Sequence, residues 1–460
     1  MQQFNRSVLD AIGNTPIIKL QNVTKDIESE IYVKLEYMNP GGSIKDRIGK
    51  YMVEKAIERG DLKPGGTIVE GTSGNTGVGL AMYAAIHGYK AIFVLPDKQS
   101  IEKINNLRAF GAKVVVTPTN VEPNDPRSYY SVARRIAETT PNSFYVNQYD
   151  NLDNRDTHYN WTGPEIYEQT KGEFDVLMAG IGTGGTLTGI GKFLKEKMPN
   201  VKIVGIDIEG SILTHYFYTR EFKPEMARPY VLEGIGEDII PLNYDWDVYD
   251  DMVMVGDKES FIMTRALLTK EGIYAGGSSG AAVVGAIKYA KELKEPKKIL
   301  VIIPDSGNRY AGKIYNDDWM RDKGYFDNSF NVSVKEVIEV LGKTKKELIT
   351  LPDTASVGDA CDLMRNKDIS QVPITRNDEI VGFVSENKLL RPLFESQISL
   401  RDPITVAMEN KFEIVDENEL LEKVANSLLN KKSVLITSNG KFVSILTDID
   451  ILNYMSHRAY

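Results

Sequence analysis

Cysteine and histidine are scarce in this chain, and their scarcity limits the chemistry that it can carry. Among 460 residues there is one cysteine, Cys361, so no intrachain disulfide, Cys-x-x-Cys redox pair or cysteine-based zinc site can form. The histidines lack the His-Glu-x-x-His spacing, or any similar spacing, of a metal site. They are His87, His158, His215 and His457. We therefore predict that the chain holds no metal.

An excess of basic residues and a long apolar run are also missing. The 55 lysines and arginines are outnumbered by 64 acidic residues, and the formal net charge of −9 argues against a protein that neutralises nucleic-acid phosphates. No apolar run approaches the roughly 18 residues of a membrane-spanning helix. The N-terminus, Met1–Arg6, lacks the basic and apolar regions of a signal peptide. We expect a cytoplasmic protein that binds neither nucleic acid nor membrane.

Glycine, in contrast, is gathered into three loops. They are Gly71–Gly77, Gly180–Thr186 and Gly276–Gly280, and Lys45 lies upstream of all three. Short apolar runs alternate with stretches of helical periodicity from about Val8 to Tyr315, which predicts an α/β fold with parallel sheets covered on both faces. Such sheets bind ligands at the carboxyl ends of their strands. Because the glycine loops fall at or beside these ends, we expect them to bind ligands.

The second loop connects a predicted strand, Phe174–Ala179, to a predicted helix, Leu187–Leu194. Backbone amides at a helix N-terminus bind an anion without a basic side chain, and the hydroxyl groups of Thr183 and Thr186 add donors. The same loop also matches the Gly-x-Gly-x-x-Gly fingerprint of dinucleotide sites, and Asp207 ends the next strand as a ribose-binding acid would. Taken alone, this loop favours NAD about as strongly as a simple phosphate site.

Lys45 and the other two loops favour pyridoxal phosphate (PLP) over NAD. Lys45 lies at a loop-to-helix junction, where the ammonium form is disfavoured and the neutral amine can form a Schiff base. The loop Thr72–Gly77 suits a substrate α-carboxylate, and Asn75 can donate to the ring oxygen of the cofactor. The hydroxyl group of Ser278 can face the pyridine nitrogen without forcing its protonation, which favours β-replacement over transamination. An NAD enzyme would leave these features unexplained.

The C-terminal part of the chain contains an internal repeat. A constant offset between similar residues indicates a duplicated module. Three pairs are each 62 positions apart: Ile374 and Ile436, Thr375 and Thr437, and Ser385 and Thr447. A polar stretch separates the repeat from the α/β part. We therefore predict a catalytic domain at 1–315, a linker at 316–332 and two repeated modules at 333–396 and 397–460.

Over about Val8–Tyr315 the chain resembles the fold type II PLP-dependent enzymes of the cysteine synthase and cystathionine β-synthase family. Five ordered motifs carry the resemblance: Ile12–Pro16, Gly42–Arg47, Thr72–Gly77, Gly182–Thr186 and Gly277–Ser278. Over about Val332–Tyr460 the chain resembles a tandem pair of cystathionine-β-synthase (CBS) domains. The resemblance implies two parallel-sheet subdomains like those of tryptophan synthase β, PLP as cofactor, and a homodimer or homotetramer. Because the chain begins just before the catalytic unit, without the haem-binding extension of animal enzymes, we expect no haem.

The resemblance also implies roles for individual residues. Lys45 would hold PLP as a Schiff base and would move the α-proton of the substrate. Further cofactor contacts would come from Asn75, Gly182, Thr183, Gly184, Gly185, Thr186 and Ser278. The substrate carboxylate would be held by Thr72, Ser73, Thr76 and Gln148. The second substrate would be covered by Tyr149 and by the Glu233–Gly236 loop with Gly234 and Gly236.

The implied reaction joins L-serine to L-homocysteine through an aminoacrylate and gives L-cystathionine and water. A cysteine synthase using O-acetylserine and sulfide, and an O-acetylserine-dependent cystathionine synthase, stay open as alternatives. The reason is Glu237, which follows Gly236 where animal and yeast synthases have a tyrosine. A nucleotide-sensing protein with an inactive catalytic unit is a third class, which the intact set of Lys45, Asn75 and Ser278 disfavours.

The two repeated modules differ at the element that holds the ribose of adenosine ligands in CBS domains. The second copy has its Thr/Ser-x-x-Asp pattern in Thr447 and Asp450, whereas the first copy has Lys388 in place of the acid. The sequence therefore predicts at most one adenosine site, in the second copy. A purely structural or dimer-forming module is the alternative.

Overall fold

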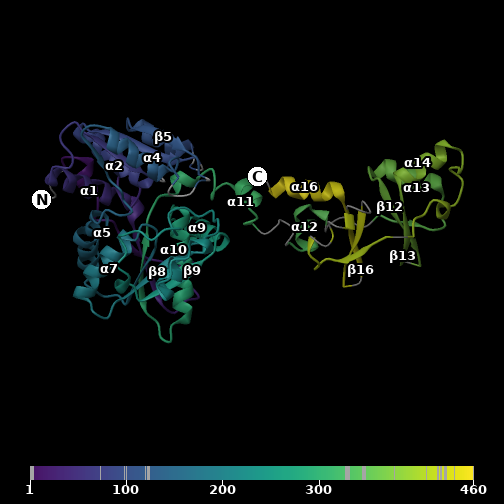
Figure 1. The fold of residues 1–460 in the computed structure, drawn as a ribbon. Coiled ribbons are helices and arrows are strands. Elements are labelled where there is room, and N and C mark those ends of the chain that lie inside the picture. Colours follow the sequence, from purple (N-terminus) through teal and green to yellow (C-terminus); the bar gives the residue numbers. More distant parts are fainter. Residues whose placement is uncertain are drawn as a thin grey trace. The chain divides into compact units, whose positions relative to one another are not determined.

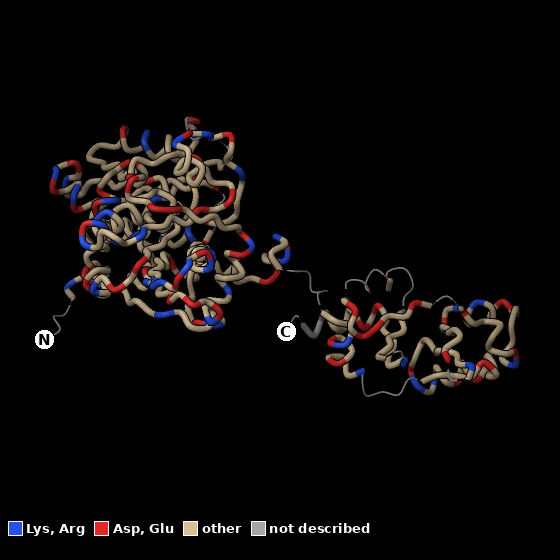
Figure 2. Tube along the Cα trace, turned by 90° about the horizontal axis from the view of Figure 1, so that it is seen from below, with Lys and Arg blue, Asp and Glu red and all other residues tan. Residues whose placement is uncertain are grey.

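The computed structural model divides the chain into two compact units, Met1–Tyr325 and Phe326–Tyr460, which we describe one at a time. The described residues are 5–72, 74–97, 99, 101–119, 121, 125–326, 332–343, 349–377, 379–410, 412–421, 424, 427–428, 433–439 and 441–458. Among these residues, basic and acidic residues alternate along the trace of both units (Figure 2). A nucleic-acid binder would instead gather basic residues on one face.

The first unit contains a six-stranded sheet in the order β1-β2-β10-β7-β8-β9, parallel except for β1. Its strands are β1 (Ile17–Lys19), β2 (Glu30–Leu35), β7 (Val176–Gly180), β8 (Lys202–Ile208), β9 (Asp251–Val255) and β10 (Lys298–Ile303). The central strands are buried almost throughout, as their continuous apolar runs predict. All the loops that follow these parallel strands therefore leave the sheet at one edge.

A second, four-stranded parallel sheet in the same unit has the order β5-β4-β3-β6. Its strands are β3 (Thr67–Gly71), β4 (Lys90–Pro96), β5 (Lys113–Thr117) and β6 (Ser143–Tyr145). Each of the two sheets has its own apolar core. The predicted α/β fold with two parallel-sheet subdomains is confirmed.

Helices cover both sheets of the first unit. In Figure 1, α2 and α4 lie with the four-stranded sheet, whereas α7 and α10 lie with the six-stranded one. The longer helices are α1 (Lys45–Arg59), α2 (Asn75–His87), α3 (Ile101–Ala109), α4 (Tyr129–Thr139), α6 (Gly163–Thr170), α7 (Gly185–Lys197), α9 (Asp257–Glu271) and α10 (Gly277–Glu292). Shorter ones are α5 (Asp153–Thr157), α8 (Leu213–Thr219), α11 (Asp317–Asp322) and a π-helix, η3 (His158–Thr162). Among the described residues, no helix is long and apolar enough to cross a membrane.

Helix α11 and the residues after it belong to the first unit. The ring of Phe261 on α9 contacts Trp319 and Tyr325, with centroid distances of 5.6 and 5.1 Å. Arg265 also donates to Asp317 (2.5 Å). The compact unit therefore includes part of the stretch at 316–332 that the sequence suggests as a linker, and the sequence-based bounds stay a prediction.

The second unit contains two copies of one small fold. In each copy a short strand pairs in parallel with the first strand of an antiparallel hairpin, and both hairpins have a register shift at the equivalent place, Ile374/Thr375 and Ile436/Thr437. The first copy has β11 (Leu351–Pro352), α13 (Val357–Lys367), β12 (Gln371–Arg376), β13 (Glu379–Ser385) and α14 (Glu386–Phe394). The second has β14 (Ile414–Asp416), β15 (Ser433–Ser438), β16 (Lys441–Thr447) and α16 (Asp448–Arg458). The duplication read from the constant offset is present.

The two copies are tied to each other by exchanged segments. Helix α12 (Val334–Val340), which precedes the first copy, packs into the core of the second. In the other direction, Ile404 lies in the core of the first copy, and Asp402 accepts the backbone N–H of Val357. The core of the second copy therefore includes helix α12, and the core of the first copy includes Ile404.

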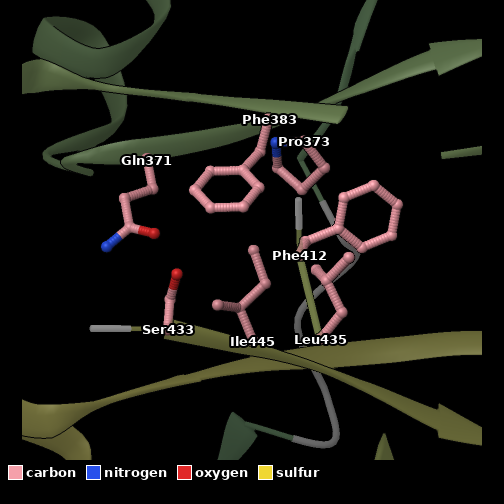
Figure 3. A pocket seen from close by; sticks show the side chains of 7 residues that line it. All are labelled: Gln371, Pro373, Phe383, Phe412, Ser433, Leu435 and Ile445. Carbon is pink, nitrogen blue, oxygen red and sulfur yellow. The ribbon is translucent and has the colours of Figure 1, made fainter. Parts of the chain in front are cut away.

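A small cavity lies at the seam between the two hairpins (Figure 3). Residues on its two walls occupy equivalent positions, 62 apart, in the two copies. These pairs are Gln371 and Ser433, Pro373 and Leu435, and Phe383 and Ile445, with Phe412 beside them. Its volume of about 10 Å³ leaves room for about one water molecule. The cavity is thus a packing seam between related surfaces.

Candidate active site

Lys45 is the first residue of α1, and its loop is attached to the end of strand β10. Ile44 donates its backbone N–H to Pro304 (2.8 Å), and Ser306 donates to Gly42 (3.0 Å). Burial lowers the pKa of Lys45 from 10.5 to about 8, although the nearby carboxylate of Glu237 acts in the opposite direction. The lowered pKa agrees with the expected disfavoured ammonium form. Its main physical cause here is burial, whereas the sequence argument used the helix end.

Asn75 and Ser278 meet at the carboxylate of Asp305, a residue that the sequence argument missed. Asn75 Nδ2 donates to Asp305 Oδ2 (2.9 Å), and Ser278 Oγ lies 3.5 Å from Asp305 Oδ1. Tyr310 donates its hydroxyl to Asp305 Oδ2 (2.7 Å), and Arg309 donates to Asn75 Oδ1. Asp305 follows β10 at its carboxyl end, which is the position where a ligand-facing residue could have been sought.

The second glycine loop turns sharply into α7. Gly184 has φ +81°, and a Cβ there would lie 2.8 Å from the ring of Tyr244. A Cβ on Gly185 would lie 2.3 Å from Asn154 Oδ1. Tyr244 also donates its hydroxyl to the carbonyl of Gly182 (2.7 Å). The first amides of α7 have no acceptor within the helix, so they are available to an anion.

Thr76 and Gln148 lie together beside the first glycine loop. Thr76 Oγ1 donates to Gln148 Oε1 (2.5 Å), and Gln148 Nε2 donates to the carbonyl of Gly71 (3.5 Å). Thr72 is fully buried, and its hydroxyl oxygen accepts the N–H of Gly74 (3.0 Å). Ser73, also predicted to hold the substrate carboxylate, lies outside the described residues.

Tyr149 belongs to a group of three tyrosines near Glu237. Its hydroxyl lies 3.2 Å from that of Tyr129, and the rings of Tyr129 and Tyr130 are 3.9 Å apart. The carboxylate of Glu237 adds to burial in raising the pKa of all three phenols. Tyr129 and Tyr130 open helix α4, and the sequence argument missed them because two adjacent tyrosines have no functional spacing.

The loop with Gly234 and Gly236 lies between Ser278 and the second glycine loop. Gly234 has φ +88°, and a Cβ there would lie 4.0 Å from Ser278 Oγ. A Cβ on Gly236, which has φ +81°, would lie 2.4 Å from the side chain of Ile208. A Cβ on Gly182 would lie 3.3 Å from the carbonyl oxygen of Gly234 and 3.5 Å from Glu237 Oε1. The structure thus brings the three glycine loops and this loop together.

Asp207 does not act as a ribose-binding acid. It is fully buried, and Oδ2 accepts both the N–H (2.9 Å) and the hydroxyl (2.8 Å) of Thr214. Oδ1 accepts the backbone N–H of Ile208 (2.9 Å). These bonds fix the turn after β8, which explains why the NAD reading of the Gly-x-Gly-x-x-Gly loop fails here.

Comparison with known proteins decides the family. The family model of pyridoxal-phosphate dependent enzymes matches residues 8–305, and that of the CBS domain matches 334–395 and 400–457. The chain is 37% identical to cystathionine beta-synthase of Dictyostelium discoideum over 98% of this chain and 92% of that one. It is 39% identical to cystathionine beta-synthase of Apis mellifera over 98% and 90% of the two chains. The chain belongs to the cystathionine beta-synthase family.

A solved structure of this family is similar to the catalytic part of the chain. The O-acetylserine dependent cystathionine beta-synthase of Helicobacter pylori has a TM-score of 0.62 and 39% sequence identity. The match covers 68% of this chain and 100% of the other. This family is PLP-dependent, so the prediction of PLP as the cofactor is confirmed, whereas the roles of Lys45 and the glycine loops stay predictions.

The donor set of this cystathionine beta-synthase family member fits PLP. The amides at the start of α7 and the hydroxyls of Thr183 and Thr186 provide neutral donors for a phosphate. Gly184 and Gly185 leave no room for a side chain there. The amine of Lys45, with a pKa of about 8, has a neutral form available for an aldehyde.

In the second unit, the predicted Thr/Ser-x-x-Asp element is closed by hydrogen bonds to one carboxylate oxygen of Asp450. Asp450 Oδ2 accepts the N–H (2.9 Å) and the hydroxyl (2.7 Å) of Thr447. The ammonium group of Lys343 is 2.5 Å from the same oxygen. In the first copy, Lys388 lies 3.6 Å from Glu409. The only acid of this element therefore already has a cationic partner among the described residues.

Proposed function

We propose that the protein joins L-serine to L-homocysteine and releases L-cystathionine and water. The observation that carries the proposal is Lys45, an amine with a lowered pKa that lies next to the loops of an anion-binding cofactor site. In the overall reaction the Cβ–O bond of serine breaks and a Cβ–S bond to homocysteine forms. Similarity to cystathionine beta-synthases over nearly the whole chain supports the same reaction.

The cofactor would be held by residues of four loops. The phosphate would be bound by the second glycine loop, that is by Gly182, Thr183, Gly184, Gly185 and Thr186. Asn75 would contact the ring oxygen, and Ser278 would contact the ring nitrogen. Bound PLP supplies an aldehyde for imine formation and a ring that withdraws electrons from the α-carbon. Ser278 offers a neutral hydroxyl group, so the ring nitrogen need not carry a proton. We also propose that no haem takes part.

Lys45 would move the proton at the α-carbon of the substrate. Burial keeps a fraction of its amine neutral near pH 7, so the side chain can take a proton and later return it. The substrate carboxylate would be held by Thr72, Ser73, Thr76 and Gln148. Holding it would keep the α-carbon at a fixed distance from the amine of Lys45. Tyr149 and the loop with Gly234 and Gly236 would exclude water while the thiol adds.

Glu237 supports an amino-acid thiol as the second substrate. Its carboxylate lies near Lys45, Tyr129 and Tyr149, as the charge effects on the pKa of these groups indicate. A carboxylate there would attract the ammonium group of homocysteine and would repel hydrosulfide. O-acetylserine as the donor remains the alternative, because the Helicobacter pylori relative has that dependence by its name.

A competition experiment tests this function. PLP-loaded protein is given serine or O-acetylserine together with equal concentrations of homocysteine and sulfide, and the products are identified by mass spectrometry. Cystathionine from serine supports the proposal. Cystathionine from O-acetylserine alone would support the O-acetylserine-dependent alternative, and cysteine as the main product would identify a cysteine synthase. The visible spectrum of the same sample should lack a haem band.

For the second unit we propose an adenosine-ligand site at Thr447 and Asp450. A ribose diol would compete with the Lys343 ammonium for Asp450, since both bind the same carboxylate. Adenosine and AMP are titrated into the full chain, with binding followed by calorimetry. Lys343→Ala should increase the affinity and Asp450→Asn should abolish binding. A chain that binds neither compound, with or without Lys343, would make the module structural.

A further inference from the structure

A buried layer of side chains lies directly behind the second glycine loop. It comes from α5 and the π-helix η3, which pack against α7. The contact is close because a Cβ on Gly189 of α7 would lie 2.2 Å from the carbonyl oxygen of Arg155 and 2.8 Å from Cβ of His158. π-helical turns are rare and occur frequently at functional sites. Gly189 thus lets the π-helix reach the first turn of α7, where Thr186 lies.

His158 connects two threonine hydroxyls across this contact. Its Nδ1 lies 2.9 Å from Thr162 Oγ1, and its Nε2 lies 3.2 Å from Thr186 Oγ1. His158 and Thr162 are fully buried. Burial, together with the positive charges of Lys45 and Arg47, lowers the pKa of His158 well below 6.5, so the ring is neutral and has one donor and one acceptor.

The neutral ring can be placed in this chain of hydrogen bonds in two ways. If Nδ1 carries the hydrogen, Thr186 must donate to Nε2, and its hydroxyl then presents only an oxygen to a phosphate. If Nε2 carries the hydrogen, Thr162 donates to Nδ1, and Nε2 donates to Thr186. The hydrogen of Thr186 is then available to a phosphate oxygen. An anion in the loop favours the second arrangement, because every group then makes a favourable bond.

Asn154, four residues before His158, acts on the other threonine of the loop. Its Nδ2 donates to Thr183 Oγ1 (3.1 Å) and to the carbonyl of Gln148 (2.7 Å). The reversed amide would place two oxygens at the Gln148 contact, so the orientation is fixed. Asn154 is fully buried. Thr183 therefore accepts a hydrogen bond from Asn154, as Thr186 can from His158. Each threonine can then donate its own hydroxyl hydrogen to an anion bound in the loop.

We propose that Asn154 and His158 are positioning residues that turn the hydroxyl hydrogens of Thr183 and Thr186 toward the phosphate group of PLP. The inference rests on the proposed function only in taking these threonines as phosphate ligands. It adds a chain of hydrogen bonds, here called the relay, that runs from Thr162 through the ring of His158 to Thr186. Because the ring is neutral, the relay orients Thr186 toward the phosphate without placing a charged imidazolium beside it.

The test measures the affinity of the apoprotein for PLP and the 31P resonance of the bound phosphate. His158→Phe removes both ring nitrogens and should weaken PLP binding about tenfold, the effect of losing a hydrogen bond to a charged group. Thr162→Val keeps the shape of its residue and removes only the first donor, so it should weaken binding in the same direction. His158→Gln, whose amide can donate to Thr186, should restore most of the affinity. The 31P resonance should shift in the Phe and Val variants.

A double-mutant cycle separates the relay from general packing. Thr186→Val should weaken PLP binding by itself, and His158→Phe should add little in that background, because His158 acts through Thr186. His215→Phe is the matched control, since His215 also contacts a threonine four positions away, Thr219 (3.3 Å), on helix α8.

Two results would overturn the relay. One is additive losses of affinity in the cycle. The other is PLP affinity within about twofold of wild type in folded His158→Phe or Thr162→Val protein. Because no amino-acid substrate is used, a wrong assignment of donor or acceptor leaves this test unaffected.

Discussion

At the scale of single residues, Lys45 should be the side chain without which the chemistry stops. Lys45→Ala removes the amine that can bind the aldehyde of PLP and move the α-proton, so the Schiff-base absorbance and nearly all turnover should be lost while the fold remains. Lys55→Ala on the same helix is the matched control, because Lys55 pairs with Glu58 at the surface. Near-normal product formation by Lys45→Ala would exclude the proposed mechanism. Absorbance, circular dichroism and product yield are the measurements.

The lowered pKa of Lys45 also predicts how PLP uptake depends on pH. Only the neutral amine attacks an aldehyde, so the rate at which apoprotein takes up PLP should rise about tenfold from pH 7 to pH 9 and level off above pH 8. Glu237 raises this pKa, and Glu237→Gln should therefore move the plateau to lower pH. A rate that still climbs steeply at pH 10 would mean that Lys45 has its ordinary pKa. Stopped-flow absorbance over the pH range gives the profile.

The Glu237→Gln variant also tests the second substrate. If the carboxylate attracts the ammonium group of homocysteine, its loss should raise KM for homocysteine by about tenfold or less and favour sulfide in competition. The preference for homocysteine over 4-mercaptobutanoate, which lacks the ammonium group, should fall at the same time. Asp238→Asn, next along the chain and exposed, is the control. An unchanged preference in Glu237→Gln would remove Glu237 from acceptor selection.

At the scale of secondary-structure elements, a buried ion-pair network anchors the start of α1. It is centred on Arg47, two residues after Lys45. Arg47 on α1 donates to Glu36 after β2 (2.8 Å) and to Glu165 on α6 (2.8 Å). Glu36→Gln leaves Arg47 with a buried charge only partly compensated, and should cost about 3 kcal/mol of unfolding free energy. The surface pair of Arg127 and Asp125 provides the control, since Asp125→Asn should change the unfolding free energy much less.

The same network gives a pH dependence of known sign. Burial acts to raise the pKa of Glu36 and of Glu165, but the charge and hydrogen bonds of Arg47, with the charge of Lys34, outweigh it and leave both pKa values below their ordinary values. Their stabilisation is therefore present above the unfolded pKa of about 4.3 and is lost as the pH falls through the lower folded values. The free energy of unfolding, measured by urea denaturation, should fall less between pH 7 and pH 3 in Glu36→Gln than in wild type. An equal effect in both proteins would mean that this carboxylate does not contribute.

The elements that the sequence predicts well are those with a local pattern. The predicted strand Phe174–Ala179 begins and ends within two residues of β7 because its apolar run is continuous. The first two glycine loops directly follow β3 and β7, whereas the third follows helix α9 and was recognised by its glycines alone. The π-helix of His158 has no such pattern, and Asp305 gains its meaning only from contacts with Asn75 and Ser278. Arg47 and Glu165 are 118 positions apart, so only the fold brings them together.

At the scale of the whole molecule, the residues proposed for PLP chemistry all lie in the first unit. Among the described residues, the apolar cores of this unit take no residue from beyond Tyr325, and those of the second unit take none from before it. A chain that ends after Tyr325 should therefore fold, bind PLP and keep its Schiff-base absorbance. Calorimetry of the full chain should show a second transition that the shortened chain lacks.

A chain that ends after Tyr315, the predicted domain bound, is the matched comparison. It lacks α11 with the fully buried Met320, and it exposes Phe261, which packs on Trp319 and Tyr325. Loss of this packing should lower the unfolding free energy by about 3–5 kcal/mol relative to the chain that ends after Tyr325. Equal stability of the two shortened chains would place the end of the catalytic domain at 315. A loss of PLP binding in both chains would instead mean that the first unit depends on the second, because every residue proposed to hold the cofactor is still present in each.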